Sequence, residues 1–335
     1  MIQSLAVKNF KSIRELSIDC RRVNVFIGEP NVGKSNLLEA LGLFSSADLR
    51  DAREFSKLVR FENFINLFCG EDASAAIEVI ASGKEARHRF SIKSEATVSY
   101  SGAYTLEEGQ RQQSLLSFTA TANGPETWQR RSGTSPLRCY RFDSRVSFGS
   151  QEGAFLNPPD GSNFLFLLRS NPELYKLIDG LFDAKGFRLV LRPHENKVEV
   201  QSSQNGRLVQ FPYSSTSDTL RRFAFHLAAL RTNRDATLIF EEPEAHSFPF
   251  YTKQLAEEMA LDERGNQFFV TTHNPYFLLP LIYKTPRQEL AIFLTAMSNH
   301  ETKVERLDDA RMDKLRDLDA DVFFNFDRLL APEGA

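Results

Sequence analysis

The sequence is poor in cysteine and has no long apolar run. Its 335 residues include three cysteines, and their positions do not match the spacing of a zinc site. An odd and scattered set of cysteines predicts reduced thiols in the cytosol and argues against a disulfide scaffold. No apolar stretch approaches the roughly 18 residues that a membrane-spanning helix needs, and the N-terminus shows no signal-peptide pattern. We therefore expect a cytoplasmic protein without a membrane segment.

The chain also lacks a strong charge imbalance and a long heptad repeat. Its formal net charge of −3 neither requires nor excludes nucleic acid, because a basic face can exist on a nearly neutral protein. The absence of heptads between the two halves excludes a long coiled-coil arm. A content of 41% hydrophobic and 25% charged residues is typical of an ordinary globular domain.

A phosphate-binding loop is the clearest motif that the sequence contains. Residues 23–27 predict a buried strand, and residues 35–41 have helical spacing, so the loop joins a strand to a helix. Its glycines allow backbone N–H groups to turn toward phosphate oxygens at a helix N-terminus, where the helix dipole favours anions. The pattern G-x-x-x-x-G-K-[ST] is matched at every position by Gly28, Glu29, Pro30, Asn31, Val32, Gly33, Lys34 and Ser35, and Asn36 follows in the helix.

The chemistry of such a loop gives its last two residues separate roles. Lys34 would reach the β and γ phosphates of a nucleotide, and the Ser35 hydroxyl would bind Mg²⁺. The alternative is a chance glycine turn before a helix, which the flanking strand and helix argue against.

Two adjacent carboxylates follow a second apolar strand, residues 236–240. Acidic residues at a strand end more often belong to a solvated turn, but the phosphate loop in the same chain favours a functional interpretation. In that interpretation Glu241 completes the Mg²⁺ site beside Ser35. Glu242 then orients and deprotonates the attacking water.

A third apolar strand, residues 267–272, ends at His273. A single histidine at a strand end is usually structural or lies on the surface. However, the carboxyl ends of parallel strands form the ligand-facing edge of a sheet. His273 could therefore donate a hydrogen bond to the γ-phosphate.

Together these motifs resemble those of the ABC-type ATPases of the RecF, structural-maintenance-of-chromosomes (SMC) and OLD group. The resemblance is closest to the stand-alone bacterial "AAA family ATPases" of the OLD-like branch. It rests on residues 7–13, the phosphate loop, residues 241–246 and residues 271–275, and it covers the region 50–155 poorly. It implies an α/β fold, namely a P-loop NTPase head with a mixed central sheet, an antiparallel β subdomain and a helical lobe.

We expect one split ATPase head over residues 1–335. Residues 1–48 would form an N-terminal lobe with the phosphate loop, and residues 50–155 an inserted, variable β region. Residues 156–335 would form a C-terminal lobe with the signature-like helix, the carboxylates and the histidine. In the β region, alternating polarity predicts an antiparallel sheet with turns at Gly83 and near Gly102.

The resemblance also implies ATP and Mg²⁺ as cofactors, hydrolysis of ATP to ADP and phosphate, and a homodimer or higher oligomer that encloses ATP. In this family a serine–glycine signature segment caps the nucleotide of a second subunit, and Ser217, before a helical stretch, is the candidate. Asp218 stands where the family has glycine, so an ordinary helix N-cap is the alternative. Lys11 and Asn31 align with family positions that touch phosphate.

Three functions remain open at this point. The resemblance implies bacterial antiphage defence, in which the ATPase switches a separate effector such as a nuclease or toxin, since no room for a nuclease domain follows residue 300. The second is a DNA-clamping maintenance ATPase like RecF or SMC, and the third is a nucleotide-gated scaffold with negligible hydrolysis. The basic, aromatic residues 128–141 could contact nucleic acid, although a structural or solvated role is favoured.

Overall fold

A six-stranded mixed sheet forms the centre of the computed structural model, which describes residues 1–131, 134–145, 147–149 and 151–325. The strand order is β16-β15-β3-β14-β13-β9, and all neighbours are parallel apart from the β15–β16 hairpin. The carboxyl ends of the parallel strands therefore meet at one edge of the sheet. The strands are β3 (Val23–Ile27), β9 (Leu137–Tyr140), β13 (Thr237–Glu241), β14 (Gln267–Thr271), β15 (Leu290–Ser298) and β16 (Glu301–Arg306).

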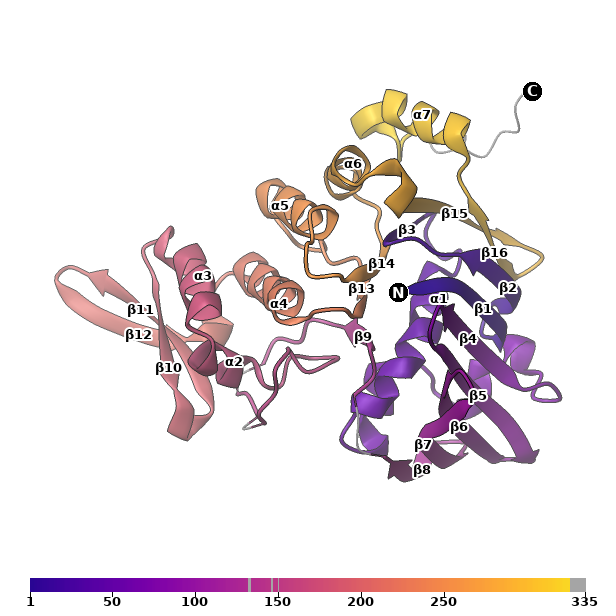
Figure 1. Cartoon of the computed structure of the whole chain (residues 1–335). Helices are drawn as coiled ribbons and strands as arrows, with labels where there is room; N and C mark the ends of the chain where they lie inside the picture. Colours follow the sequence, from indigo (N-terminus) through magenta and orange to yellow (C-terminus); the bar gives the residue numbers. More distant parts are fainter. Residues whose placement is uncertain (132–133, 146, 150, 326–335) are drawn as a thin grey trace.

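Helices cover both faces of the central sheet (Figure 1). Val23, Val25 and Ile27 of β3 belong to the core that includes α4, α5 and α6, whereas Phe26 belongs to the core that includes α1. Parallel strands covered on both faces are almost continuously apolar, which is why β3, β13 and β14 are recognisable in the sequence. The helices are α1 (Lys34–Gly42), α4 (Asp218–Thr232), α5 (Pro249–Ala260), α6 (Pro275–Lys284) and, near the end of the described chain, α7 (Asp309–Leu318).

The second sheet is antiparallel and has seven strands in the order β2-β1-β4-β5-β6-β7-β8. Its aromatic residues fill the space between the sheet and the segments around α1. The ring of Phe118 stacks on Trp128, with 5.5 Å between centroids. The strands are β1 (Ile2–Phe10), β2 (Ile13–Asp19), β4 (Ile77–Gly83), β5 (Arg87–Ala96), β6 (Ser99–Glu108), β7 (Arg111–Thr121) and β8 (Gly124–Arg130).

A smaller lobe extends from the central sheet and lies at the left of Figure 1. It contains the helices α2 (Phe164–Ser170) and α3 (Pro172–Asp183) and a three-stranded antiparallel sheet. The strands are β10 (Arg188–Arg192), β11 (Lys197–Gln204) and β12 (Arg207–Pro212). No helix within the described ranges is long and apolar enough to cross a membrane.

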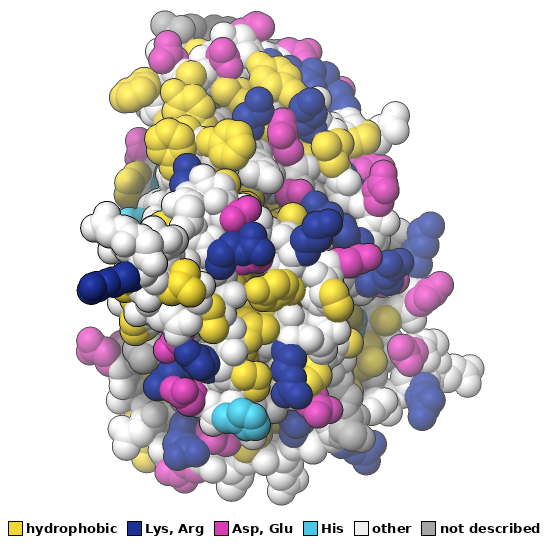
Figure 2. Space-filling model, turned by 90° about the vertical axis from the view of Figure 1, so that its left-hand side faces the viewer, with side chains coloured by type: hydrophobic (Ala, Val, Ile, Leu, Met, Phe, Trp, Pro, Cys, Tyr) yellow, Lys and Arg dark blue, Asp and Glu magenta, His cyan; other side chains and the backbone are white. Residues whose placement is uncertain are grey.

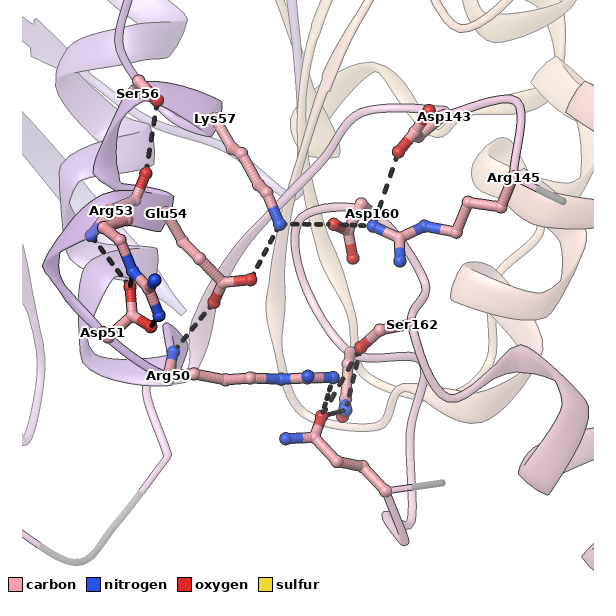
Figure 3. Close-up of polar contacts among 12 residues, drawn as sticks. Arg50, Asp51, Arg53, Glu54, Ser56, Lys57, Asp143, Arg145, Asp160 and Ser162 are labelled. Atoms are coloured by element: carbon pink, nitrogen blue, oxygen red, sulfur yellow. Dashed lines mark hydrogen bonds and ion pairs between the residues drawn. The ribbon is translucent and has the colours of Figure 1, made fainter. Parts of the chain in front are cut away.

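A polar network joins the segment after α1 to the segment that leads into the smaller lobe (Figure 3). Lys57, at the end of the 3₁₀ helix η2 (Ala52–Lys57), lies 2.7 Å from Glu54 Oε1 and 3.0 Å from Asp160 Oδ2. Asp160 also pairs with Arg145. Because Asp160 is buried, these cations compensate for a charge that would otherwise be costly to remove from water.

The predicted α/β class, with a mixed central sheet, an antiparallel β subdomain and a helical lobe, is confirmed. Strand β3 has the predicted bounds, β13 is shifted by one residue toward the C-terminus, and β14 ends one residue before the predicted end. Strand β4 ends at the predicted turn residue Gly83, whereas the turn predicted near Gly102 lies at residues 97–98, between β5 and β6, and Gly102 itself lies inside β6. Of the strands in the predicted N-terminal lobe, β1 and β2 belong to the seven-stranded sheet and β3 to the central sheet. Residues 326–335 of the predicted C-terminal lobe lie outside the described residues.

The reason for a glycine inside β6 is the ring of Phe118. A Cβ at Gly102 would lie 2.1 Å from Cζ of that ring. We expect Gly102→Ala to lower the free energy of unfolding by about 1–3 kcal/mol, because a buried ring would have to move.

Gly180→Ala is the matched control, because a Cβ added in α3 at this position meets no atom within 4 Å. Alanine should stabilise that helix by up to about 1 kcal/mol. Urea denaturation measures both variants. If Gly102→Ala were as stable as the wild-type protein, the sheet would accommodate the extra methyl group freely and the prediction would be wrong.

Candidate nucleotide site

A cavity of about 510 Å³ lies at the carboxyl ends of β3, β13 and β14. It brings the phosphate loop together with the turn after β13 and the turn after β14, which both lie more than 200 residues further along the sequence. The lining residues are Ser12, Pro30, Asn31, Gly33, Lys34, Ser35, Asn36, Arg60, Glu242, Thr271, His273 and Met297.

The phosphate loop turns sharply just before α1. Gly33 is the N-cap of α1 and has φ 92°, and Asn31 has φ 64°. A residue with a side chain would be strained at position 33, whereas asparagine at position 31 tolerates the left-handed region. The N-terminal end of α1 thereby opens directly into the cavity, and its unpaired N–H groups favour an anion there.

Lys34 is folded back onto its own loop. Its ammonium group donates to the carbonyl oxygens of Gly28 at 2.9 Å and Glu29 at 2.6 Å. Burial lowers the pKa of Lys34 to about 8, while the charges of Glu242 and Glu29 oppose this shift. Gly28 and Glu29 thus face the lysine, outside the cavity lining, and the lysine is held beside the place where phosphate charge would compensate for its burial.

Glu242 and His273 form a pair across the cavity from the lysine. His273 Nε2 lies 3.2 Å from Glu242 Oε1, and this hydrogen bond is the main reason why the pKa of Glu242 lies below its usual range. Glu242 also has φ 42°, a strained conformation for a non-glycine residue that is characteristic of functional turns. The carboxylate is therefore ionised at neutral pH and can accept a proton.

Glu241 lies beside the cavity, where arginines hold it. Arg60 Nη2 is 3.4 Å from one oxygen of Glu241, and Arg141 Nη2 is 3.5 Å from the other. The same two arginines contact Glu39 of α1, which is fully buried and also pairs with Lys11. Lys11 donates to Glu39 and to the carbonyl oxygen of Arg60, so the structure directs it away from the cavity.

A buried carboxyl group connects the turn after β13 to the turn after β14. Glu244 is 5% exposed and accepts a hydrogen bond from the Thr272 hydroxyl, while its second oxygen has no partner among the described residues. Thr272 Oγ1 in turn accepts from the backbone N–H of Asn274. Glu244 therefore ties the turn that carries Glu242 to the turn that carries His273.

The signature candidate lies elsewhere in the chain. Ser217 is the N-cap of α4 and does not belong to the cavity lining. Asp218, at the position of the family's glycine, pairs with Arg221 at 3.1 Å and with Arg222 at 2.6 Å. A second subunit would be required to bring Ser217 to a nucleotide.

Sequence reasoning missed four of the lining residues: Ser12, Arg60, Thr271 and Met297. Ser12 lies within the segment 7–13 that carried the resemblance. It follows Lys11 directly, so the expected phosphate contact was placed one residue too early. Arg60 belongs to a region without a recognisable motif. Among the described residues, no group of three or more His, Cys, Asp or Glu side chains is arranged to hold a metal ion. A cation here would need oxygens from Ser35, from a carboxylate and from phosphate, which is the usual situation for Mg²⁺.

The buried carboxyl group of Glu244 leads to a pH prediction. Burial raises the pKa of Glu244 to about 7 from the ordinary value of 4.5. The folded protein should therefore lose about 3 kcal/mol of stability between pH 4.5 and pH 7, as the unfolded chain releases this proton first. Glutamine does not titrate, so Glu244→Gln removes this contribution to the pH dependence of the free energy of unfolding. Between pH 4.5 and pH 8 the variant should therefore gain about 3 kcal/mol of stability relative to wild type.

Urea denaturation at the two pH values measures this change. Glu263→Gln serves as the control, because Glu263 is exposed. Parallel pH profiles for wild type and Glu244→Gln would contradict the prediction.

Two curated proteins share short segments with this chain. An uncharacterised protein of Methanocaldococcus jannaschii is 46% identical over 48 residues, which are 14% of this chain and 22% of that protein. A protein named ATP/GTP phosphatase from Helicobacter pylori is 52% identical over 42 residues, which are 12% of this chain and 11% of that protein. The matched segments thus span less than a quarter of either relative.

SMC head domains have a similar structure over almost the whole chain. The head domain bound to the C-winged helix domain of ScpA has a TM-score of 0.51 and 15% identity, and the match covers 92% of this chain and 99% of that one. A head domain with an extended coiled coil, bound to the C-terminal domain of ScpA derived from Pyrococcus furiosus, has a TM-score of 0.50 and 13% identity, with 94% and 98% covered. At these identities the similarity concerns the fold.

One family matches most of the sequence. It is described as "AAA domain, putative AbiEii toxin, Type IV TA system", and the match extends over residues 23–279. That range contains the phosphate loop, both carboxylates and His273. Because this match covers most of the chain, the protein belongs to this AAA-domain family, AAA_21.

Proposed function

We propose that this protein binds and hydrolyses ATP, dimerises around the nucleotide and thereby switches a separate effector protein, in bacterial antiphage defence. The observation that carries the ATPase part is the shared cavity of Lys34, Ser35, Glu242 and His273. A cation, a hydroxyl group, a carboxylate and an imidazole around one anion-binding helix terminus are the groups that phosphoryl transfer to water requires.

The residues of the cavity fit ATP and Mg²⁺. Lys34 is held by carbonyl oxygens alone and would exchange them for β and γ phosphate oxygens. Ser35 and Glu241 would hold Mg²⁺, with Arg60 and Arg141 releasing the carboxylate as the ion takes their place. Bound there, the ion neutralises phosphate charge. Asn31, Gly33 and the neighbouring non-proline residues of the loop would surround the phosphates with backbone N–H groups, while Pro30, which has no N–H, lines the cavity with its ring.

Glu242 and His273 would act on the attacking water. The Glu242 carboxylate is ionised and accepts the proton of water as the oxygen approaches the γ-phosphate. His273 fixes the carboxylate through Nε2 and would be placed to donate to a γ-phosphate oxygen once nucleotide is bound. The buried Glu244–Thr272 contact keeps the two turns at the required separation.

The location of Ser217 supports dimerisation. The segment lies outside the cavity of its own chain, and it opens a 15-residue helix whose N-terminal N–H groups favour a phosphate. In a symmetric dimer each Ser217 would reach the nucleotide of the other subunit. ATP binding would then close the dimer, and hydrolysis would release it.

The effector would be a separate nuclease or toxin in the cytoplasm. The family description names a putative toxin and a type IV toxin–antitoxin system, which supports a defence setting. The structurally similar SMC heads are bound to a domain of ScpA, so a head of this fold can carry a partner protein. The three cysteines are free and buried, which is compatible with a reducing compartment.

The second candidate, a DNA-clamping ATPase, has its support in the SMC-like fold. Against it, three of the four arginines in the stretch 128–141 are used internally: Arg130 donates to backbone carbonyls, Arg138 stacks on Phe155 at 3.4 Å, and Arg141 pairs with Glu39. On the face drawn in Figure 2, basic and acidic side chains are interspersed and form no patch of one sign. Phosphate-backbone binding requires a concentrated basic surface.

The third candidate, a scaffold with negligible hydrolysis, is favoured by Asp218. Its carboxylate stands at the signature glycine position, where a negative charge would repel phosphate. The two arginines that pair with it compensate for this charge. For that reason we favour the active ATPase.

Glu242→Gln tests the catalytic assignment. The amide cannot accept the proton, so ATP turnover should fall by at least about 100-fold. ATP binding should persist, and light scattering should show a dimer that is stabilised by ATP. Glu263→Gln, an exposed substitution, should behave as wild type. Unchanged hydrolysis in Glu242→Gln would rule out this role for Glu242.

Adding DNA separates the maintenance and defence functions. We expect double-stranded DNA to change the ATPase rate of the wild-type protein by less than about twofold, because Arg130, Arg138 and Arg141 are engaged internally and leave no concentrated basic surface in residues 128–141. Co-purification of the protein with its genomic neighbours should yield a nuclease or toxin. Strong stimulation by DNA, without such a partner, would favour the clamp.

A further inference from the structure

The phosphate loop receives a hydrogen bond from the other end of the chain. Thr302 lies at the start of β16, which lies beside β2 in Figure 1, and it is 2% exposed. Its backbone N–H donates to the carbonyl oxygen of Ser12 at 2.7 Å, and its hydroxyl group donates to the carbonyl oxygen of Val32 at 3.0 Å. Val32 belongs to the phosphate loop, so the β15–β16 hairpin directly contacts the element that would bind phosphate.

The protons in this contact can be assigned. Asn36 Nδ2 lies 2.7 Å from Ser12 Oγ, and Ser12 Oγ lies 2.6 Å from Thr302 Oγ1. A carbonyl oxygen can only accept, so the single hydroxyl proton of Thr302 belongs to the Val32 bond. The hydroxyl proton of Ser12 must then point to Thr302, and Ser12 accepts from the amide of Asn36. The result is a chain of donors in one direction, Asn36 to Ser12 to Thr302 to Val32, in which each bond strengthens the next.

The last bond of this chain fixes the orientation of one peptide group. Like the other described peptide bonds apart from Pro158–Pro159, the bond between Val32 and Gly33 is trans. In a planar trans peptide, the C=O and the following N–H point in opposite directions. Since Thr302 holds the Val32 carbonyl on its own side, the Gly33 N–H faces the other side, where Gly33 lines the cavity. A flipped peptide would present a carbonyl oxygen to the phosphate instead.

Packing reinforces this arrangement. A Cβ at Gly33 would lie 1.9 Å from Thr302 Oγ1 and 2.8 Å from Ser12 Oγ. The two hydroxyl groups therefore fill the space next to Gly33, and a side chain at position 33 would collide with them.

We propose that Thr302 and Ser12 are positioning residues that hold the Val32–Gly33 peptide in its anion-binding orientation, so that nucleotide affinity depends on a hydroxyl group supplied by the β15–β16 hairpin. This inference rests on the proposed nucleotide-binding function. Neither hydroxyl group takes part in proton transfer. Their loss should therefore weaken nucleotide binding and raise KM while leaving kcat within about twofold of wild type.

Thr302→Val tests the inference, because valine keeps the shape of threonine and lacks the hydroxyl group. We expect the Kd for Mg²⁺·ADP, measured by calorimetry on the full chain, to rise about five- to tenfold, the effect of losing one buried hydrogen bond. Thr302→Ser retains the hydroxyl group and should bind within about twofold of wild type.

Thr295→Val is the matched control. Thr295 is a buried threonine of the same hairpin, and its hydroxyl group has no hydrogen-bond partner among the described residues. The substitution should leave the Kd unchanged. If Thr302→Val fails to fold, Ser12→Ala interrupts the same chain from the β1–β2 turn and should weaken binding similarly.

The outcomes separate this inference from the proposed function. Wild-type affinity in both Thr302→Val and Ser12→Ala, or an equal loss in Thr295→Val, overturns the positioning role alone. Absence of nucleotide binding by the wild-type protein overturns the proposed function and this inference with it.

Discussion

The parallel register of β3, β14 and β13 is the constraint on which the site depends. Phe26 of β3 lies opposite Thr271 of β14, and Thr271 lies opposite Glu241 of β13. The three strands therefore end in one row, and each chain turn after that row enters the same cavity. The backbone hydrogen bonds between these buried apolar strands break only when the surrounding core unfolds. The groups that line the cavity consequently have fixed spacing even though they come from distant parts of the sequence.

Charge compensation is the second condition that the site satisfies. Glu39 is fully buried behind the phosphate loop and has Lys11, Arg60 and Arg141 around it. An uncompensated carboxylate there would be strongly destabilising. Arg60 and Arg141 also reach Glu241, so the buried Glu39 and the proposed metal ligand share two of their cations. Binding of a divalent ion at Glu241 would therefore also change the surroundings of α1.

The sequence was most informative where one physical requirement determines the residue type. The phosphate loop needs glycine at a positive φ, and buried parallel strands need apolar side chains on both faces, so β3, β13 and β14 are evident. Local patterns carry no information about contacts between distant segments. Arg60 and Thr302 belong to stretches without a motif, and only the folded chain brings them to the loop. β12 was missed because its residues are mostly exposed and lack alternation. The turn was predicted a few residues too late, near Gly102, because the ring that requires this glycine inside a strand is 16 residues away in the sequence.

Strand β3 lies in the interior of the central sheet, between β15 and β14, and all five of its residues are buried. Its amide hydrogens should therefore exchange with solvent only when the whole domain unfolds, whereas exposed lobes and edge hairpins open more readily. The strand that carries the phosphate loop is thus a rigid foundation. Motions that admit or release a ligand must come from the segments that surround the loop and not from the strand beneath it.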